Sequence, residues 1–419
     1  MKTNIKQQLK RIATIKRFVL LTLAISMAQF FSSCDTDDIL GIEENMQTLS
    51  GSYDEELILK NIFDDSAKAD YTVSGDMVIN DKLIIEAGVR IELEEDVELV
   101  VSSSGHIIAE GTESNMIVLT TAHLDAGKHW KGLRIESSDQ RNTLEYVKID
   151  FAGNSNMKLG PYSSQNRQTN VGVDDDAALT ILHTELSGSK GYGLFVRGQI
   201  VDHQGNAYKD NSKGALSTHI QNAGEIDDES IYIGNGYDGP EIYGGVLQEE
   251  IEWSKLSEDA TYRISSSIEI EAALNITQGV TIELDEDVMI EIKEASGGST
   301  GDGYINVTGT EASPVIFTTS NLAGGQHWKG IYVKTSDVRN IMNNVIVEYA
   351  GNSNISIGPY SSQNRAANIG VDSQASLEIT SGVIRHSNGW GIAAMESSNI
   401  QLQDVSYEGN TEGELTIVD

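Results

Sequence analysis

The chain is poor in the residues that usually stiffen or cross-link a fold, with one cysteine and four prolines in 419 residues. A single cysteine, Cys34, leaves no partner for an internal disulfide, so packing must hold the fold together. Long apolar runs are lacking as well, because the stretch from Phe18 to Phe31 is too short to cross a bilayer. No later segment shows a long helical period, which argues against a helical architecture.

Basic residues are also scarce. Six of the 29 Lys and Arg residues, and none of the 63 Asp and Glu residues, precede Cys34. The chain from Cys34 onward therefore carries 23 basic and 63 acidic residues, a net charge of −40. A field of this sign repels nucleic acid and anionic membranes, and it disfavours polyanionic substrates that no cation bridges. The same charge also keeps a cell-surface protein soluble, which is the simpler interpretation.

The first 33 residues have the features of a targeting segment. A basic region with Lys2, Arg11 and Arg17 precedes the apolar stretch, which ends in Phe31-Ser32-Ser33-Cys34. This ending resembles the lipobox of bacterial lipoproteins, in which cleavage precedes a cysteine that is then acylated. Residues 1–33 are therefore predicted to be a lipoprotein signal peptide and Cys34 the lipidation site. The alternative is an ordinary secretory signal with an accidental cysteine.

An acidic cluster, Asp35-Thr36-Asp37-Asp38, follows the cysteine directly. It resembles the surface-export tag of Bacteroidetes-type lipoproteins, although a solvated linker has the same composition. The predicted location is the outer membrane, with the lipid at Cys34 as the membrane contact and the protein exposed at the cell surface. Residues 34–70 are polar and mixed, and are predicted to be a disordered tether.

The chain contains an internal duplication. The octapeptide from Gly160 to Arg167 returns unchanged from Gly358 to Arg365, 198 residues later. The same offset relates Gly153–Asn156 to Gly351–Asn354, and His129–Gly132 to His327–Gly330. Repeats of this kind decide the architecture. The first block is predicted to span residues 71–198 and the second residues 262–419, with residues 199–261 as a connector.

A smaller offset of 191 relates Val89–Val97 to Val280–Val288. Seven extra residues must therefore lie between these segments and the 198-residue matches. Their predicted place is Ala295–Gly301, a surface loop by its Ser and Gly content.

Short runs rich in β-branched residues recur between Gly, Asn, Ser and Asp, for example Met116–Thr120 and Leu179–Leu182. Sandwiches and barrels use longer strands. Very short strands favour an all-β solenoid, a parallel β-helix whose coils stack at roughly 4.8 Å. In such a fold inward side chains stack on their equivalents in neighbouring coils. About five coils are expected in each block at somewhat over twenty residues per coil.

Three segments carry a family resemblance: Thr120-Thr121, then Trp130-Lys131-Gly132-Leu133, then Val147–Gly153. Together they resemble the right-handed parallel β-helix lipoproteins of the pectate-lyase-like superfamily. The second half repeats them with Thr318-Thr319, Trp328–Ile331 and Val345–Gly351. The resemblance implies the right-handed fold for most of the chain after the leader. It implies no activity, since this fold carries lyases, hydrolases, adhesins and inert stalks.

The repeated polar segments are the candidate ligand site. Amides, guanidinium groups and tyrosine rings suit sugar hydroxyls. Turn chemistry and hydrogen-bonded ladders between coils explain many of the same residue types, and this structural role is favoured over binding. The candidate residues are Asn154, Asn156, Tyr162, Gln165, Asn166 and Arg167, with Asn352, Asn354, Tyr360, Gln363, Asn364 and Arg365.

Two further motifs have simpler explanations. His129-Trp130 and His327-Trp328 supply a base and a sugar platform in principle, but a tryptophan that covers the core and a histidine in a turn are favoured. Asp174-Asp175-Asp176 has the carboxylates that Ca²⁺ prefers, yet the second block keeps only Asp372. A turn role is therefore favoured, and no metal or other cofactor is predicted.

Enzyme motifs are absent, including the Gly-His-Gly and Arg-Ile-Lys motifs of polygalacturonases and the Arg-x-Pro-x-x-Arg motif of pectate lyases. The sequence therefore predicts a non-catalytic surface lipoprotein that binds a neutral glycan or a partner protein. One alternative is a polysaccharide lyase or hydrolase that uses Arg167 or a Ca²⁺ near Asp174, with His129 or Tyr162 as the base. The other alternative is a structural spacer of the cell envelope.

Overall fold

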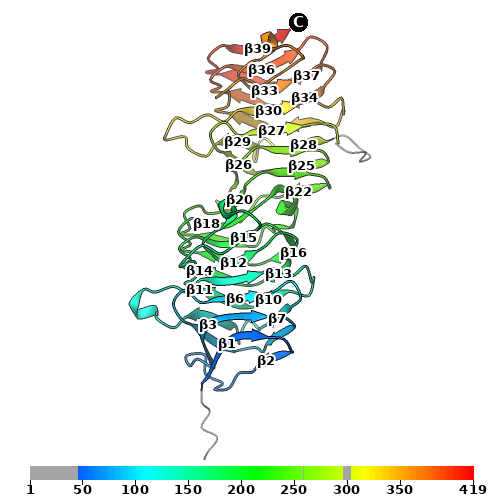
Figure 1. Cartoon of the computed structure of the whole chain (residues 1–419). Helices are drawn as coiled ribbons and strands as arrows, with labels where there is room; N and C mark the ends of the chain where they lie inside the picture. The colour runs from blue at the N-terminus through cyan, green and yellow to red at the C-terminus, as the bar shows by residue number, and fades with distance from the viewer. Residues whose placement is uncertain (1–45, 258, 296–302) are drawn as a thin grey trace, which may run out of the picture. The chain divides into compact units, whose positions relative to one another are not determined.

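A computed structural model describes residues 46–257, 259–295 and 303–419 (Figure 1). The predicted signal peptide, Cys34 and nearly all of the predicted insertion loop lie outside these residues. Residues Gln47 to Asp419 form one compact unit. All pairings between its named strands are parallel, and the prediction of an all-β parallel β-helix is confirmed.

Each coil of the first block contributes three short strands, and the strands of successive coils pair into ladders. The first ladder contains β2 (Leu57–Leu59), β4 (Lys82–Ile85), β7 (His106–Glu110), β10 (Thr143–Glu145), β13 (Ala178–Leu182) and β16 (Gln199–Gln204). The second contains β5 (Arg90–Leu93), β8 (Ile117–Thr121), β11 (Val147–Asp150), β14 (Glu185–Ser187), β17 (Ala207–Lys209) and β19 (Ile231–Ile233). The third contains β6 (Glu98–Val101), β9 (Gly132–Ile135), β12 (Thr169–Val173), β15 (Tyr192–Val196), β18 (Gly214–Thr218) and β20 (Pro240–Ile242).

The second block repeats this plan with three more ladders. One contains β21 (Gly245–Leu247), β24 (Ile268–Ile270), β27 (Met289–Ile292), β30 (Gly330–Val333), β33 (Ala367–Val371), β36 (Trp390–Met395) and β39 (Gly413–Val418). Another contains β22 (Ile251–Trp253), β25 (Ala273–Thr277), β28 (Tyr304–Thr308), β31 (Ile341–Asn343), β34 (Ser376–Thr380) and β37 (Asn399–Gln403). The last contains β23 (Tyr262–Ile264), β26 (Thr281–Leu284), β29 (Val315–Thr319), β32 (Val345–Glu348), β35 (Val383–Arg385) and β38 (Ser406–Glu408).

Alternation along each strand builds the core. In β5 and β26, buried Ile and Leu alternate with half-buried polar residues, as a period of two requires. The buried side chains form a continuous apolar column from Leu59 to Ile392 and Ala394. Interior positions thus repeat from coil to coil, while the outward positions are free to vary.

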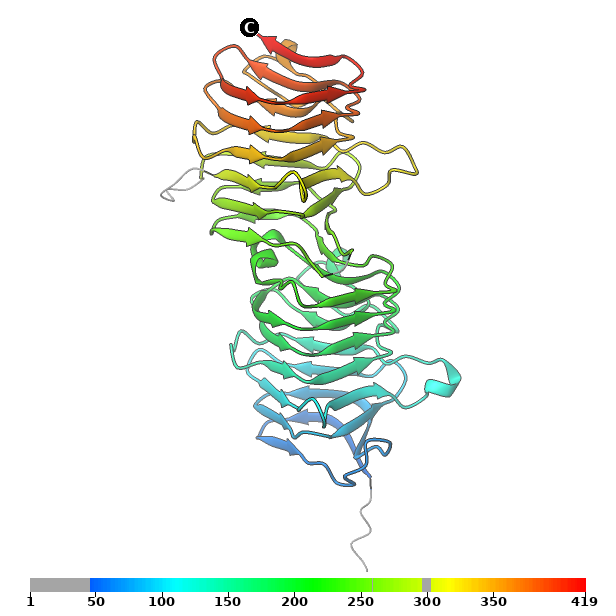
Figure 2. The same cartoon turned by 180° about the vertical axis from the view of Figure 1, so that it is seen from behind.

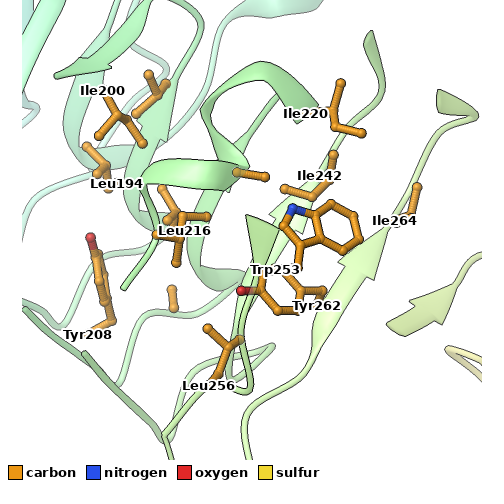
Figure 3. Packing of buried hydrophobic residues seen from close by; sticks show 14 of the residues in the cluster. Leu194, Ile200, Tyr208, Leu216, Ile220, Ile242, Trp253, Leu256, Tyr262 and Ile264 are labelled. Atoms are coloured by element: carbon orange, nitrogen blue, oxygen red, sulfur yellow. The ribbon is translucent and has the colours of Figure 1, made fainter. Parts of the chain in front are cut away.

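Residues 199–261, predicted to be a connector, contain strands β16 to β22 and a 3-10 helix, η3 (Ile220–Glu225). The helix contacts β16 on one side and β21 on the other, at the place where a strand of the first ladder is expected. The core at this junction carries large side chains, with Trp253 stacked on Tyr262 and the two ring centroids 4.8 Å apart (Figure 3). The stack of coils is therefore continuous through the segment.

At the junction, the third ladder of the first block continues into a ladder of the second block that is offset by one strand position. Strand β20 pairs with β18 of the first block and with β23 of the second. The third ladder of the first block therefore continues into the ladder of β26, although β26 is the sequence equivalent of β5 in the second ladder. Equivalent strands of the two blocks consequently belong to different ladders.

The loops after β8 and β29 show how this shift affects the surface. These loops, residues 122–131 and 320–329, are equivalent, and both project to the left in Figure 1 and to the right in Figure 2. Because the ladders are offset by one strand while the loops share a side, the coils must turn by one face across the junction. Equivalent surfaces of the two blocks are thereby brought to the same side.

The solenoid begins earlier than the sequence predicts. Strands β1 (Gln47–Tyr53) and β2 lie within the predicted tether, and β1 pairs with β3 (Tyr71–Ile79), which also pairs with β5 and β6. Buried Asp70 closes this first coil by accepting hydrogen bonds from the backbone N–H groups of Ile62 and Arg90. The tether prediction is therefore wrong for residues 47–70, because an end coil is polar on its exposed side and resembles a linker in composition.

Within the described residues, no helix has the length and apolar character needed to span a membrane.

Candidate functional site: two repeated polar loops

The repeated octapeptides lie in two long loops at equivalent places in the coils. The first polar loop, residues 151–168, joins β11 to β12, and the second, residues 349–366, joins β32 to β33. An antiparallel bridge closes each loop, between Met157 and Arg167 in the first and between Ile355 and Arg365 in the second. Since β11 pairs with β8 and β12 with β9, each polar loop leaves the same corner as the projecting loop one coil earlier. Both polar loops therefore lie on the same side of the unit.

Glycines under each loop make room for its apolar side chains. A Cβ on Gly172 would stand 2.5 Å from Met157 Sδ, and one on Gly132 would stand 2.7 Å from Met157 Cε. In the second block, a Cβ on Gly370 or Gly330 would meet Ile355 at 3.0 and 2.8 Å. Each loop thus folds back onto the outside of its sheet and forms a small second core there, because the strand beneath presents no side chain at these points.

Most of the predicted polar residues in the first loop hold the loop itself. Gln165 Oε1 accepts a hydrogen bond from the backbone N–H of Tyr162 at 2.9 Å, and Asn166 Oδ1 accepts one from Leu159. Arg167 Nη1 donates to the backbone carbonyls of Ser164 and Asn166 at 2.7 and 2.9 Å. These amides and this guanidinium group are largely engaged in fixing the loop, as the structural interpretation expects.

The second loop repeats the glutamine and arginine bonds to the loop backbone. Gln363 Oε1 accepts from the N–H of Tyr360 at 2.8 Å, and Gln363 Nε2 donates to the backbone carbonyl of Asp419. Arg365 Nη1 donates to the carbonyls of Ser362 and Asn364, both at 2.8 Å. The glutamine and arginine bonds that both copies share hold the two loops in the same way.

The tyrosines differ from their neighbours. Tyr162 is 68% exposed and Tyr360 67% exposed, among the most exposed large apolar side chains of the described residues. Each begins a 3-10 turn, η2 (Ser163–Gln165) or η4 (Ser361–Gln363). A large ring on a rigid backbone loses little entropy on binding, so these two side chains are the best-placed ligand contacts of the predicted set.

The asparagines near the start of each loop differ in whether their side chains are already hydrogen-bonded. Asn154 is bound on both sides, donating through Nδ2 to Asp96 and accepting at Oδ1 from Lys190 Nζ. Asn156, Asn352 and Asn354 are exposed and remain available at the edges of the loops.

Asp174 and Asp372 fix the far end of each loop. Asp174 Oδ1 accepts from the backbone N–H groups of Gly160 and Asp175, and Asp372 Oδ1 accepts from those of Gly358 and Ser373. In the first block Asp175 also pairs with Arg197 at 2.8 Å. The turn role predicted for these aspartates agrees with this geometry. No group of three or more potential metal ligands occurs in the described part of the chain.

Beneath the loops the two blocks differ. Arg167 lies over the ring of Phe195, with its Cζ 5.0 Å from the ring centroid, and Phe195 stacks on Tyr243. Ala393 takes the place of Phe195 in the second block. There the buried ring of Tyr332 fills the space, and its hydroxyl donates to the carbonyl of Ser356 and to Asp372. The first loop therefore has a phenylalanine ring beneath its arginine, whereas the second block has an alanine at that position.

The His-Trp pairs have structural positions. Trp130 and Trp328 are fully buried, and their indole Nε1 groups donate to the carbonyls of Asp150 and Glu348. His129 contacts the carbonyls of Gly188 and Gly127 through its two ring nitrogens, and burial lowers its pKa. His129 and Arg167, named for a lyase mechanism, are thus both held by loop carbonyls.

Sequence reasoning missed a set of buried asparagines. Asn170 and Asn368 are fully buried and accept the backbone N–H of Ala152 and Ala350 through Oδ1. Asn170 also donates to Asn211, which donates to Asn235 at 2.8 Å. The predicted asparagine ladder therefore exists, but it is built from residues outside the octapeptides. The 198-residue offset that relates Asn170 to Asn368 was the available signal.

The fold and these loops define the chain as a parallel β-helix protein with a duplicated surface. Residues 52–175 match the family model described as pectate-lyase like beta helix domain, which covers most of the first block and part of the segment predicted to be a tether. No curated protein and no solved structure matches the chain.

Proposed function

We propose that this protein is a non-catalytic binding protein of the cell surface, which engages a neutral glycan through the side that carries both polar loops. The observation that carries the proposal is the pair of exposed rings, Tyr162 and Tyr360, on two loops held by the same bonds. A tyrosine ring offers an apolar face to a sugar and a hydroxyl at its edge. The net charge of −40 on the chain from Cys34 onward favours a neutral ligand over a polyanionic one.

The common side of the loops supports a bivalent arrangement. Two weak sites on one side engage one polymer together, and the second contact then becomes intramolecular. Overall affinity rises without a tight single site, which suits loops that offer one ring each. Removing one tyrosine is then expected to cost more avidity on a polymer than affinity on a short oligosaccharide.

A glycan array with the chain from Cys34 onward tests this proposal. The double variant Tyr162→Ala with Tyr360→Ala is expected to weaken binding at least about tenfold, a loss typical of a central aromatic contact. A double variant Tyr162→Phe with Tyr360→Phe keeps the rings and is expected to retain most of the binding.

Leu124→Ala with Leu322→Ala is the matched control, because these leucines are 52% and 57% exposed at equivalent positions of the projecting loops. The proposal fails if the unsubstituted protein binds no neutral glycan, or if the tyrosine and leucine variants lose the same amount. Binding to a protein instead of every glycan tested also counts against it.

We also propose that the chain is a lipoprotein held in the outer membrane by an acyl group on Cys34. The support is the basic and apolar leader that ends in Ser32-Ser33-Cys34, followed by three aspartates within four residues. Metabolic labelling with a fatty-acid analogue is expected to mark the protein, and Cys34→Ala is expected to abolish the label. Protease treatment of whole cells then tests exposure at the surface, and full protection would contradict it.

A further inference from the structure

A groove of about 510 Å³ lies on the second block, at the corner between the ladder of β28 and the ladder of β29. It extends over the turns of four consecutive coils, from Thr310 through Asn344 and Ser381 to Asp404. Three coil spacings of roughly 4.8 Å give it a length of about 14 Å. Its volume falls in the range of small-ligand sites. None of the octapeptide residues line it.

The equivalent corner of the first block is filled by two rings. Tyr146 and His183 stack there with centroids 4.8 Å apart, and each has a positive φ, 49° and 48°. Their equivalents 198 residues later are Asn344 and Ser381, which keep the positive φ at 48° and 55°. The backbone of the corner is thus the same in both blocks, and the loss of two rings accompanies the open groove.

The residues at the floor of the groove also differ between the two blocks. In the first block Lys148 Nζ pairs with Glu185 at 2.9 Å across neighbouring strands. The second block has Ile346 and Val383 at these positions, and both are half-buried and line the groove. The first block therefore has an ion pair beneath a ring stack, whereas the second block has an apolar floor that is open to a ligand.

The rim is acidic and polar. Glu311 and Asp404 line the groove, and no lysine or arginine does. Within the part of the chain that the structure describes, the Glu311 carboxylate makes no hydrogen bond or ion pair, so its oxygens are free to accept hydrogen bonds. Asn344 uses Nδ2 on the carbonyl of Gly309, which leaves Oδ1 to accept a further bond. Acceptors around an apolar floor suit a ligand that donates hydroxyl hydrogens and presents a CH face.

We infer that this groove is a second carbohydrate site, which takes a short neutral oligosaccharide with one ring face on Ile346 and Val383 and its hydroxyls donating to Glu311, Asp404 and Asn344. Two carboxylates without a cation repel uronic acids, so acidic sugars are excluded. The site is independent of the polar loops, and it stands or falls separately from the function proposed for them.

Refilling the groove tests the inference with residues that the chain already uses at the same corner. Titration calorimetry is run on the chain from Cys34 onward with neutral oligosaccharides of three to six units, and with uronic-acid oligosaccharides of equal length. The double variant Asn344→Tyr with Ser381→His restores the stack of the first block. It is expected to weaken neutral-oligosaccharide binding to the groove at least about tenfold. The double variant Tyr162→Ala with Tyr360→Ala is expected to leave binding to the groove unchanged.

A second variant protects the test against misfolding of the first. Glu311→Ala removes an exposed carboxylate without filling the groove, and it is expected to weaken the same binding about threefold to tenfold. The inference is overturned if neutral oligosaccharides bind both groove variants as tightly as the unsubstituted protein, if none binds the unsubstituted protein, or if the uronic acids bind this groove better. If the groove variants lose oligosaccharide binding and the tyrosine variants do not, the result supports the groove site and contradicts the polar-loop proposal.

Discussion

The two blocks have nearly the same interior and different corners. Buried Trp130 and Trp328 make the same bond, and the polar loops repeat almost bond for bond. The stacked ring pair, however, moves from Tyr146 and His183 in the first block to Tyr349 and His386 in the second, with centroids 5.0 Å apart. The second pair lies at the corner where the first block has Phe151 and Gly188.

This difference shows which positions of a solenoid are free to change. A corner residue of positive φ points outward, so a ring there covers the surface without entering the column of stacked core residues. Rings are therefore exchanged between corners at little cost to the fold. The duplication has kept the scaffold and has altered the surface on which the proposed binding depends.

The largest expected effect tests whether the interiors are equal. Trp130→Ala and Trp328→Ala each remove a fully buried indole and leave a carbonyl without its donor, and each is expected to cost about 3–5 kcal/mol of unfolding free energy. Urea unfolding followed by circular dichroism measures both. A loss in one block of less than half that in the other would show that the interiors differ in packing despite their sequence match.

Close backbone contact under the loops is the next test. A Cβ on Gly191 would lie 1.8 Å from the carbonyl oxygen of Gln168, and one on Gly389 would lie 2.1 Å from that of Ala366. Gly191→Ala and Gly389→Ala are expected to cost about 2–3 kcal/mol, since backbone cannot rotate away. Gly75→Ala is the control, because its nearest atom would be 3.8 Å away. Equal stability of all three variants would contradict the close approach.

Acid is expected to weaken the junction through Asp227. Burial acts to raise the pKa of Asp227, but the His203 ring, with Nδ1 3.6 Å from the carboxylate, and hydrogen bonds from the Ser230 N–H and hydroxyl outweigh burial and lower the pKa to about 2. A lowered pKa stabilises the folded state above the unfolded value near 4, and this stability is lost as the pH falls through about 2. At pH 7 the contribution is up to about 2 kcal/mol.

Unfolding midpoints at pH 6 and pH 2.5 measure this contribution. Asp227→Asn is expected to lower the midpoint at pH 6 and to make it less dependent on pH. A variant as pH-dependent as the unsubstituted protein would place the acid sensitivity elsewhere.

A smaller effect separates the supports of the two polar loops. Tyr332→Phe removes hydroxyl bonds to Ser356 and Asp372 and is expected to cost about 1–2 kcal/mol. The first block has Arg134 at this position, bound to Glu98 instead, so its loop has no such bond to lose. Proteolysis within residues 349–366 should accelerate in the variant while the first loop is unaffected. Equal acceleration in both loops would contradict a local effect.

The smallest effect concerns the exposed rings. Tyr162→Ala and Tyr360→Ala are each expected to change the unfolding free energy by less than about 0.5 kcal/mol, since both rings lie mostly in solvent. A loss above 1 kcal/mol in either variant would show that the ring supports its loop, and would weaken the binding interpretation for that block.

Much of the fold could be predicted because its signals are local and repeated. Alternation in segments such as Arg90–Leu93 and Thr281–Leu284 predicted short strands, and the 198-residue match predicted two blocks. The turn roles of Asp174 and Asp372 followed from their place after Val173 and Val371. The start of the solenoid was missed, because the exposed face of β1 has the composition of a linker.

Within the candidate site, the sequence predicted which residues belong to the loops better than it predicted what their side chains bind. Gln165 and Arg167 were named as possible sugar ligands, but their bonds are largely to their own loop. The groove at Asn344 and Ser381 was not predicted at all. The groove is open because Asn344 and Ser381 replace the two rings of the first block. A substitution by a smaller residue carries no local sequence signal for a cavity.

The sequence by itself determined the strands, the duplication and the charge, because each follows from residues close together or from a repeated pattern. Only the tertiary structure decided that the ladders slip by one strand at η3, that the coils turn so both polar loops share a side, and that one corner is filled while its equivalent is open. These features arise from how coils separated by many residues pack on one another, and the stacking of such coils is not encoded in any single segment.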